Sequence, residues 1–157
     1  MSEAFQIRGG KKLHGEITPQ GAKNEALQIL CAVLLTDEEV RIKNIPDIHD
    51  VNRLIEILGD FGVKITKNAH GDYTFKADQV NFDYIKSKEF KKDGAKLRGS
   101  IMILGPMLAR FGEAYMPTPG GDKIGRRRLD THFQGFVELG AEFHRSEEHT
   151  SELQSQR

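Results

Sequence analysis

Apolar and polar positions along the chain follow two periods, and these periods predict where helices and strands lie. Residues 21–35 predict a helix whose interior, residues 29–35, is apolar all round, so we expect it to be buried on every side. Residues 48–61 place apolar side chains on one helical face, which predicts an amphipathic helix. Short alternating runs predict strands at residues 40–42, 63–65 and 73–75, the last two joined as a hairpin.

The second half of the chain follows the same order. Residues 98–109 predict another apolar helix, and residues 130–139 predict another amphipathic helix. Strands are expected at residues 113–116 and 141–143. The polar, lysine-rich residues 78–96 predict a connection that contains a short strand or turn.

The two halves resemble a repeat. A shift of 74 residues places Ile29 and Leu30 on Ile103 and Leu104, and a shift of 78 aligns the second helices. One such unit cannot cover its own apolar helix, so we expect the units to pack with their helices inward and their sheets outward. The alternative is a chance resemblance between two β-α units.

Both ends of the chain differ from this repeat. Residues 5–8 and 13–18 alternate around Gly9-Gly10, which predicts a short antiparallel pair. Residues 145–157 show no periodicity and resemble the translation of a sequencing-library adapter. We therefore expect a non-native tail there that has no part in the fold or the function, with a polar, disordered natural tail as the alternative.

Composition limits the class of protein. A length of 157 residues fits one domain, and the basic and acidic residues number 23 each, so no overall field favours nucleic acid or a membrane as partner. The single cysteine, Cys31, lies in an apolar run, which predicts a buried thiol and a reducing, cytoplasmic compartment. No stretch is long enough to span a membrane, and the first residues lack a signal-peptide pattern. We expect no metal and no cofactor.

One loop concentrates the candidate chemistry. Residues 119–128 contain three glycines and one carboxylate, Asp122, and they end in three consecutive arginines. Glycine permits close backbone approach, and converging cations favour an anionic ligand, so the loop predicts a lid over an anionic substrate with Asp122 as candidate proton donor or acceptor. The alternative is a solvated basic loop in which Asp122 is a turn residue.

Two further cations stand at matching helix starts. Lys23 begins the first apolar helix and Arg98 begins the second. A helix N-terminus offers backbone N–H groups and the positive end of the helix dipole, so a cation beside it can help to hold a phosphate. Several such groups together predict a substrate with more than one anionic group.

Three motifs carry a resemblance to a known family. They are Gly21-Ala22-Lys23-Asn24, Leu97-Arg98-Gly99-Ser100-Ile101, and Pro119-Gly120-Gly121-Asp122-Lys123-Ile124-Gly125-Arg126-Arg127 followed by Asp130-Thr131-His132. In this order, and over residues 5–144, the chain closely resembles the UDP-N-acetylglucosamine 1-carboxyvinyltransferases, a family of enolpyruvyl transferases. The resemblance implies an α/β fold, the inside-out α/β barrel of repeated β-α units with internal helices, here truncated. Residues 21–144 would form two repeat units of the first domain, and residues 1–20 would belong to a second domain that is missing.

The resemblance also implies an activity. The family transfers the enolpyruvyl group of phosphoenolpyruvate to the 3-hydroxyl of UDP-N-acetylglucosamine and releases phosphate, the first committed step of peptidoglycan precursor synthesis. The resemblance assigns phosphoenolpyruvate binding to Lys23, Asn24 and Arg127. It assigns UDP-N-acetylglucosamine binding to Arg98, Arg127, Arg128, Leu129, Asp130 and Thr131.

Asp122 departs from the pattern of the family. It stands where most members have the cysteine that donates the proton and reacts with the epoxide antibiotic fosfomycin. A carboxylic acid can supply a proton but has no thiolate, so we expect an active enzyme that is insensitive to fosfomycin.

Two other functions fit the same patterns. A 5-enolpyruvylshikimate-3-phosphate synthase shares the fold and phosphoenolpyruvate, and a non-catalytic nucleotide-sugar binding module would use the same cations. In each case the partners are small molecules, and neither nucleic acid nor a membrane is expected. Because the second domain is missing, we expect this fragment to be inactive by itself.

Overall fold

The computed structural model describes residues 5–117, 129–145 and 150–155. The elements of its first half are α1 (Lys23–Ala32), the 3-10 helix η1 (Val33–Leu35), β1 (Glu39–Ile42), α2 (His49–Asp60), β2 (Lys64–Ala69) and β3 (Asp72–Lys76). The predicted order of helix, strand, helix and hairpin is therefore confirmed.

The second half repeats this order after two short helices. Its elements are α3 (Phe82–Ile85), α4 (Lys88–Gly94), the 3-10 helix η2 (Arg98–Ile103), α5 (Leu104–Phe111), β4 (Glu113–Pro117), α6 (Asp130–Glu138), β5 (Ala141–Arg145) and β6 (Thr150–Ser155). The helix predicted at residues 98–109 is thus divided between η2 and α5. Pro106 lies in the first turn of α5, where its missing N–H removes no hydrogen bond from the α-helix.

Each half builds an antiparallel sheet with the same topology. The strand orders are β1-β3-β2 and β4-β6-β5, so the last strand of each unit lies between the other two. Phe75 of β3 pairs with Ile65, and Leu153 of β6 pairs with Phe143. Both residues of the second pair lie 78 positions after those of the first, so the two sheets share a pairing register as well as a strand order.

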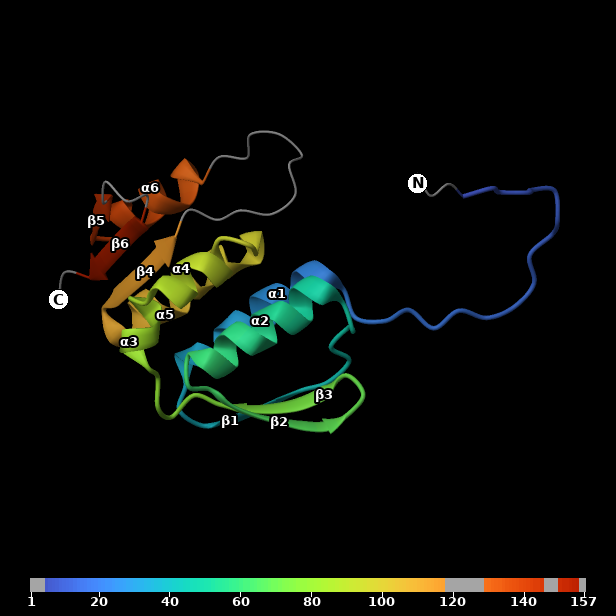
Figure 1. Cartoon of the computed structure of the whole chain (residues 1–157), viewed down its shortest axis with the longest axis horizontal. Helices are drawn as coiled ribbons and strands as arrows, with labels where there is room; N and C mark the ends of the chain where they lie inside the picture. Colours follow the sequence, from blue (N-terminus) through green and yellow to red (C-terminus); the bar gives the residue numbers. More distant parts are fainter. Residues whose placement is uncertain (1–4, 118–128, 146–149, 156–157) are drawn as a thin grey trace.

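Helices α1, α2, α4 and α5 lie between the two sheets. Figure 1 shows the sheet β1-β3-β2 along one side of α1 and α2, with α4 and α5 between these helices and the second sheet. One apolar core runs through both units because α1 packs against α2 and η2, and α5 packs against η1. Leu30, Leu54, Phe75 and Leu104 are fully buried in it.

Burial of α1 is one-sided. Its residues Ala26, Leu27, Leu30 and Cys31 are buried, whereas Ile29 exposes 42% of its surface. The prediction that this helix is buried on every side was therefore wrong for this chain. The apolar pattern is continuous around the helix, but the described residues cover only the face toward α2 and η2.

The connection between the units is helical, contrary to the strand or turn that we expected. The Asn81 carboxamide accepts hydrogen bonds from the N–H groups of Asp83 and Tyr84 at the start of α3, and the Ser87 hydroxyl accepts one from Phe90 N at 3.1 Å at the start of α4. Phe90 is fully buried, and its ring centroid lies 5.1 Å from that of Phe61. Two caps and one aromatic anchor hold a segment that is otherwise too polar to show a helical pattern.

The N-terminal segment forms no strand pair. Residues 5–20 extend away from the body of the molecule (Figure 1), and their large apolar side chains, Phe5, Ile7, Leu13 and Ile17, are 90% to 99% exposed. The expected antiparallel pair was therefore wrong for this chain. A two-stranded hairpin is marginal in water without an apolar surface to cover it.

The C-terminal segment is structured over residues 150–155, although we expected no part of the fold there. These residues form β6 and pair with β4 on one side and β5 on the other. Strands β4 and β5 lie one strand apart, so both present unpaired backbone groups to the position between them. Backbone pairing needs no particular side chains, which is why a sequence without apolar periodicity can occupy this position.

Candidate functional site

The first turns of α1 and α2 lie side by side and present opposite charges. Lys23 is the first residue of α1, and Asp50 is the second residue of α2. The Lys23 ammonium forms an ion pair with the Asp50 carboxylate, and both side chains are part-exposed. Asn24, the next predicted phosphoenolpyruvate contact, is exposed in the same turn of α1.

The backbone before Lys23 is held by a close contact. A Cβ on Gly21 would lie 2.0 Å from the Asn44 carbonyl oxygen, so only glycine fits at this point. Asn44 itself has φ 60°, in the left-handed region that asparagine tolerates better than most residues. The first turn of α1 is therefore placed by tight backbone packing against the loop that leads into α2.

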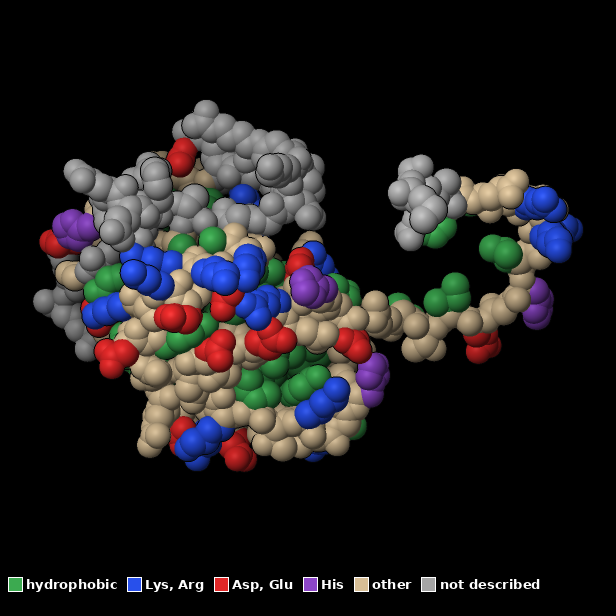
Figure 2. All heavy atoms as spheres, viewed as in Figure 1, with side chains coloured by type: hydrophobic (Ala, Val, Ile, Leu, Met, Phe, Trp, Pro, Cys, Tyr) green, Lys and Arg blue, Asp and Glu red, His purple; other side chains and the backbone are tan. Residues whose placement is uncertain are grey.

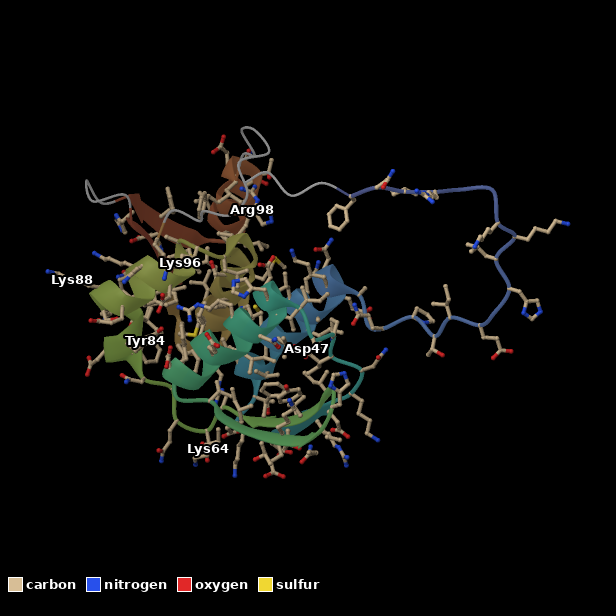
Figure 3. The ribbon with its side chains drawn as sticks, turned by 45° about the vertical axis from the view of Figure 1, so that its right-hand side comes forward. Asp47, Lys64, Tyr84, Lys88, Lys96 and Arg98 are labelled. Carbon is tan, nitrogen blue, oxygen red and sulfur yellow. The ribbon has the colours of Figure 1, made fainter. Side chains whose placement is uncertain are left out.

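Arg98 lies at the neighbouring helix start. It is the first residue of η2, and the next residue, Gly99, packs against Leu27, which lies one helical turn after Lys23. The buried Ser100 hydroxyl donates to the carbonyl oxygens of Gly94 and Leu97 at 2.9 and 2.6 Å, and these hydrogen bonds hold the start of η2 in place. Lys23 and Arg98 therefore begin two elements, α1 and η2, that pack against each other. Figure 3 shows Arg98 on the side of the molecule opposite Lys64 and the first sheet.

The last described residue before the glycine-rich loop, Pro117, lies close to this junction of α1 and η2. Pro117, the last residue of β4, lies against Gly94, because a Cβ on Gly94 would lie 3.0 Å from Pro117 Cγ. Gly94 is four residues before Arg98. The predicted site residues Asp122, Arg127 and Arg128 lie outside the described residues.

The predicted UDP-sugar residues after the loop begin α6. Leu129 precedes the helix and is half-buried, whereas Asp130 and Thr131 are exposed in its first turn. Phe133 of α6 stacks on Phe143 of β5, with ring centroids 4.7 Å apart. This packing sets the start of α6 at the edge of the second sheet.

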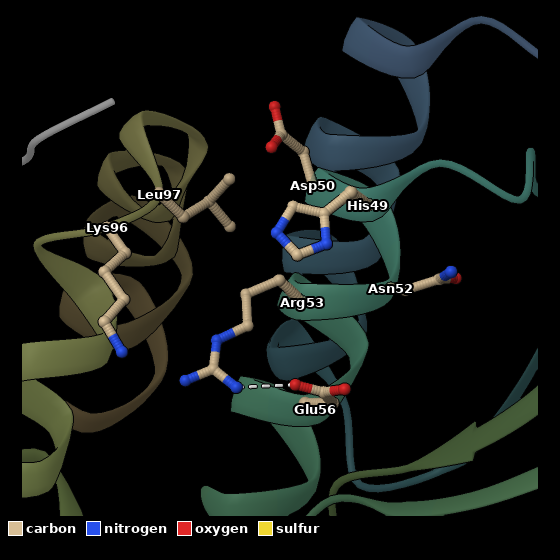
Figure 4. A pocket seen from close by; sticks show the side chains of 7 residues that line it. All are labelled: His49, Asp50, Asn52, Arg53, Glu56, Lys96 and Leu97. Atoms are coloured by element: carbon tan, nitrogen blue, oxygen red, sulfur yellow. Dashed lines mark hydrogen bonds and ion pairs between the residues drawn. The ribbon is translucent and has the colours of Figure 1, made fainter. Parts of the chain in front are cut away.

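A polar groove of about 690 Å³ opens beside the Lys23–Asp50 pair, between α2 and the segment that joins α4 to η2. Figure 4 shows the residues that line it, which are His49, Asp50, Asn52, Arg53, Glu56, Lys96 and Leu97. We did not predict this groove, because its second wall is formed by a segment that we expected to be a strand or turn. The polar residues at 49, 50, 52, 53 and 56 were the only signal in the sequence, and any solvated helix face shows it.

Charges in the groove are largely compensated. Arg53 donates to Glu56 Oε2 at 2.6 Å and is also bound to Asp93, and Lys96 Nζ lies 3.2 Å from Asp93 Oδ1. Burial alone would raise the pKa of Asp93, but hydrogen bonds from Lys96 and Arg53 hold it below its ordinary value. Figure 2 shows Lys and Arg side chains gathered over α4 and the adjoining part of α2, with acidic side chains among them. The groove therefore has polar walls with little uncompensated charge.

Among the described residues there is neither a metal-binding cluster nor a membrane-spanning helix. They include no cluster of three or more His, Cys, Asp or Glu side chains that could hold a metal ion. The helices in this part of the chain are all too short or too polar to cross a bilayer.

Known proteins resemble this chain in both sequence and fold. A UDP-N-acetylglucosamine 1-carboxyvinyltransferase of Bacteroides fragilis is 58% identical over 145 residues, which cover 92% of this chain and 33% of that protein. The corresponding protein of Borreliella burgdorferi is 44% identical over 138 residues, covering 88% and 31%. The chain thus spans about a third of the length of these curated relatives.

A solved structure has a similar fold. The enolpyruvyl transferase NikO from Streptomyces tendae matches with a TM-score of 0.66 and 21% identity, over 95% of this chain and 32% of that one. This likeness confirms the predicted α/β fold class. The family model for EPSP synthase (3-phosphoshikimate 1-carboxyvinyltransferase) matches residues 7–156. A match over nearly the whole chain, supported by the shared fold, shows that the chain belongs to this family of enolpyruvyl transferases.

Proposed function

We propose that the protein of which this chain is part transfers the enolpyruvyl group from phosphoenolpyruvate to the 3-hydroxyl of UDP-N-acetylglucosamine and releases phosphate. The observation that carries this proposal is the 58% identity to relatives named for that reaction. The product would enter peptidoglycan precursor synthesis in the cytoplasm. Both substrates are anionic, and Lys23 and Arg98, at the starts of the packed elements α1 and η2, are candidate cations for such groups.

We assign the residues by their place in the motifs. Lys23, Asn24 and Arg127 would bind phosphoenolpyruvate. Asp122 would supply the proton to the developing methyl group. The nucleotide sugar would be bound by Arg98, Arg127, Arg128, Leu129, Asp130 and Thr131.

This chain by itself would be inactive. Its exposed apolar positions, Ile29 of α1 and Phe5 and Ile7 of the N-terminal segment, are the surfaces that further parts of the protein would cover. Residues 1–20 would pair within a second domain. Residues 145–157 would be replaced in the natural protein by the strand that belongs between β4 and β5.

The test is a phosphate-release assay on the protein encoded by the uninterrupted reading frame. With phosphoenolpyruvate present, we expect turnover with UDP-N-acetylglucosamine and none with shikimate 3-phosphate. Turnover with shikimate 3-phosphate alone would favour the other activity of the family. Binding of UDP-N-acetylglucosamine without phosphate release would show a non-catalytic binding module.

A further inference from the structure

The ion pair between Lys23 and Asp50 joins two helix starts whose charges have opposite effects. Asp50 lies in the first turn of α2, where a carboxylate interacts favourably with the positive end of the helix dipole. Lys23 lies in the first turn of α1, where the same dipole repels a cation. The position of Lys23 is therefore unfavourable for α1 by itself, and the Asp50 carboxylate compensates for it.

The core fixes the distance between these two turns. Leu27 and Leu30 of α1 and Val51 and Leu54 of α2 are buried in the same cluster, and the two helices pack directly against each other. The loop before α2 is held by the hydrogen bond from Ile45 N to Gly71 O at 2.9 Å. The core packing between α1 and α2 thus holds the backbone that carries Asp50 against α1, in addition to the ion pair.

Asp50 also stands apart from the other charges of its helix. Arg53 is bound to Glu56 and Asp93. Figure 4 shows the Asp50 carboxylate directed away from the Arg53–Glu56 pair. The carboxylate is therefore directed to the Lys23 ammonium, whose side chain has four carbons and would otherwise sample many rotamers.

We propose that Asp50 is a positioning residue, which holds the Lys23 ammonium in the orientation that meets the anionic group of the donor substrate. This inference rests on the proposed function. It makes a specific kinetic prediction, because Asp50 contributes both orientation and a negative charge close to where an anion binds. Removing the carboxylate disorders Lys23 and slows the reaction, but it also removes a charge that repels the substrate.

The experiment compares Asp50→Asn and Asp47→Asn in the full-length protein. Asp47 makes the matched control, since it lies three residues before Asp50 and its exposed carboxylate accepts a hydrogen bond from Asn52 Nδ2 at 2.7 Å. We expect Asp50→Asn to lower kcat by about 10-fold or more without raising the KM for phosphoenolpyruvate, as misplacement of a substrate-binding group does. Asp50→Glu should restore part of kcat, and Asp47→Asn should behave as the parent.

The double variant with Lys23→Arg shows whether Asp50 acts through Lys23. In that case the losses in kcat from Asp50→Asn and Lys23→Arg do not multiply, because both act on one interaction. Fully multiplicative losses, or an unchanged kcat in a normally folded Asp50→Asn variant, would overturn the proposal.

A second measurement keeps this inference separate from the proposed function. Amine acetylation read by mass spectrometry reports how well the Lys23 ammonium is held, with or without turnover. Asp50→Asn should raise the labelling rate of Lys23 severalfold, and Asp47→Asn should not. If the parent releases no phosphate, the proposed function fails by itself. Equal labelling of Lys23 in the three proteins would overturn the role of Asp50.

Discussion

Arg110 Nη1 donates a hydrogen bond to the Leu34 carbonyl oxygen at 3.0 Å, across 76 residues of sequence. The same nitrogen lies 2.9 Å from Thr36 O and 2.8 Å from Ala77 O. Arg110 belongs to the last turn of α5 in the second unit. Its three acceptors lie in the first unit, at the C-terminal ends of η1 and β3. One guanidinium therefore joins the ends of two elements of one unit to the helix of the other.

Replacement of Arg110 by alanine should destabilise the fold, because three carbonyl groups between the units lose their donor. We expect the free energy of unfolding to fall by about 1–3 kcal/mol, the usual cost of leaving part-buried polar groups unpaired. Chemical denaturation measures the change. Lys92→Ala, at an exposed side chain of α4, serves as control and should leave the midpoint nearly unchanged. Equal midpoints for Arg110→Ala and its parent would show that the contact contributes nothing.

Gly21→Ala should also destabilise the protein, since the new methyl group would meet the Asn44 carbonyl oxygen at 2.0 Å. Overpacking of this kind costs about 1–3 kcal/mol where the backbone must shift. Gly9→Ala is the matched control, because a Cβ there meets nothing within 4 Å. Thermal unfolding of both variants tests the expectation, and a normal midpoint for Gly21→Ala would contradict it.

Asp72 should titrate at unusually low pH. Two hydrogen bonds from Arg41, of 2.9 and 2.7 Å, lower the pKa of the Asp72 carboxyl to about 2. Because the pKa is depressed in the folded state, the stabilisation is complete above the unfolded value of about 3.9 and is lost as pH falls through 2. Carboxyl chemical shifts followed by NMR measure this pKa. Arg41→Gln should return it toward the ordinary value, and an unshifted pKa in the parent would refute the assignment.

Cys31 should resist thiol reagents in the native protein. The side chain is buried among apolar residues, and burial raises the pKa of its thiol to about 12, so almost no thiolate forms near neutral pH. Absorbance with an aromatic disulfide reagent should show slow reaction in buffer and rapid reaction in denaturant. Fast labelling under native conditions would mean that α1 opens readily.

Fosfomycin should not inhibit the full-length protein if Asp122 is its proton donor. A carboxylate at this position lacks the thiolate that opens the epoxide. Substitution of Asp122 by cysteine should confer time-dependent inhibition in the phosphate-release assay. Equal sensitivity of the parent and the variant would discard this expectation.

Local patterns were sufficient for most elements. The apolar period of residues 48–61 and the turn at residues 70–72 predicted α2 and the β2–β3 hairpin, because burial and turn geometry there act within one element. Predictions from local patterns failed where the burial of a segment depends on residues far away in the sequence. Residues 5–8 alternate as a strand does, but no surface covers them here, and residues 82–94 became helical through caps and the distant contact of Phe90 with Phe61.

The candidate site shows the same division. The sequence by itself determined which side chains could hold anions, since Lys23 and Arg98 could be recognised at helix starts from local pattern alone. Only the tertiary structure decided that these starts adjoin, that Asp50 meets Lys23, and that α2 and the segment between α4 and η2 enclose a groove. The physical reason is that charge and helical period are properties of neighbouring residues, whereas an ion pair between helices depends on how a shared core sets their relative positions.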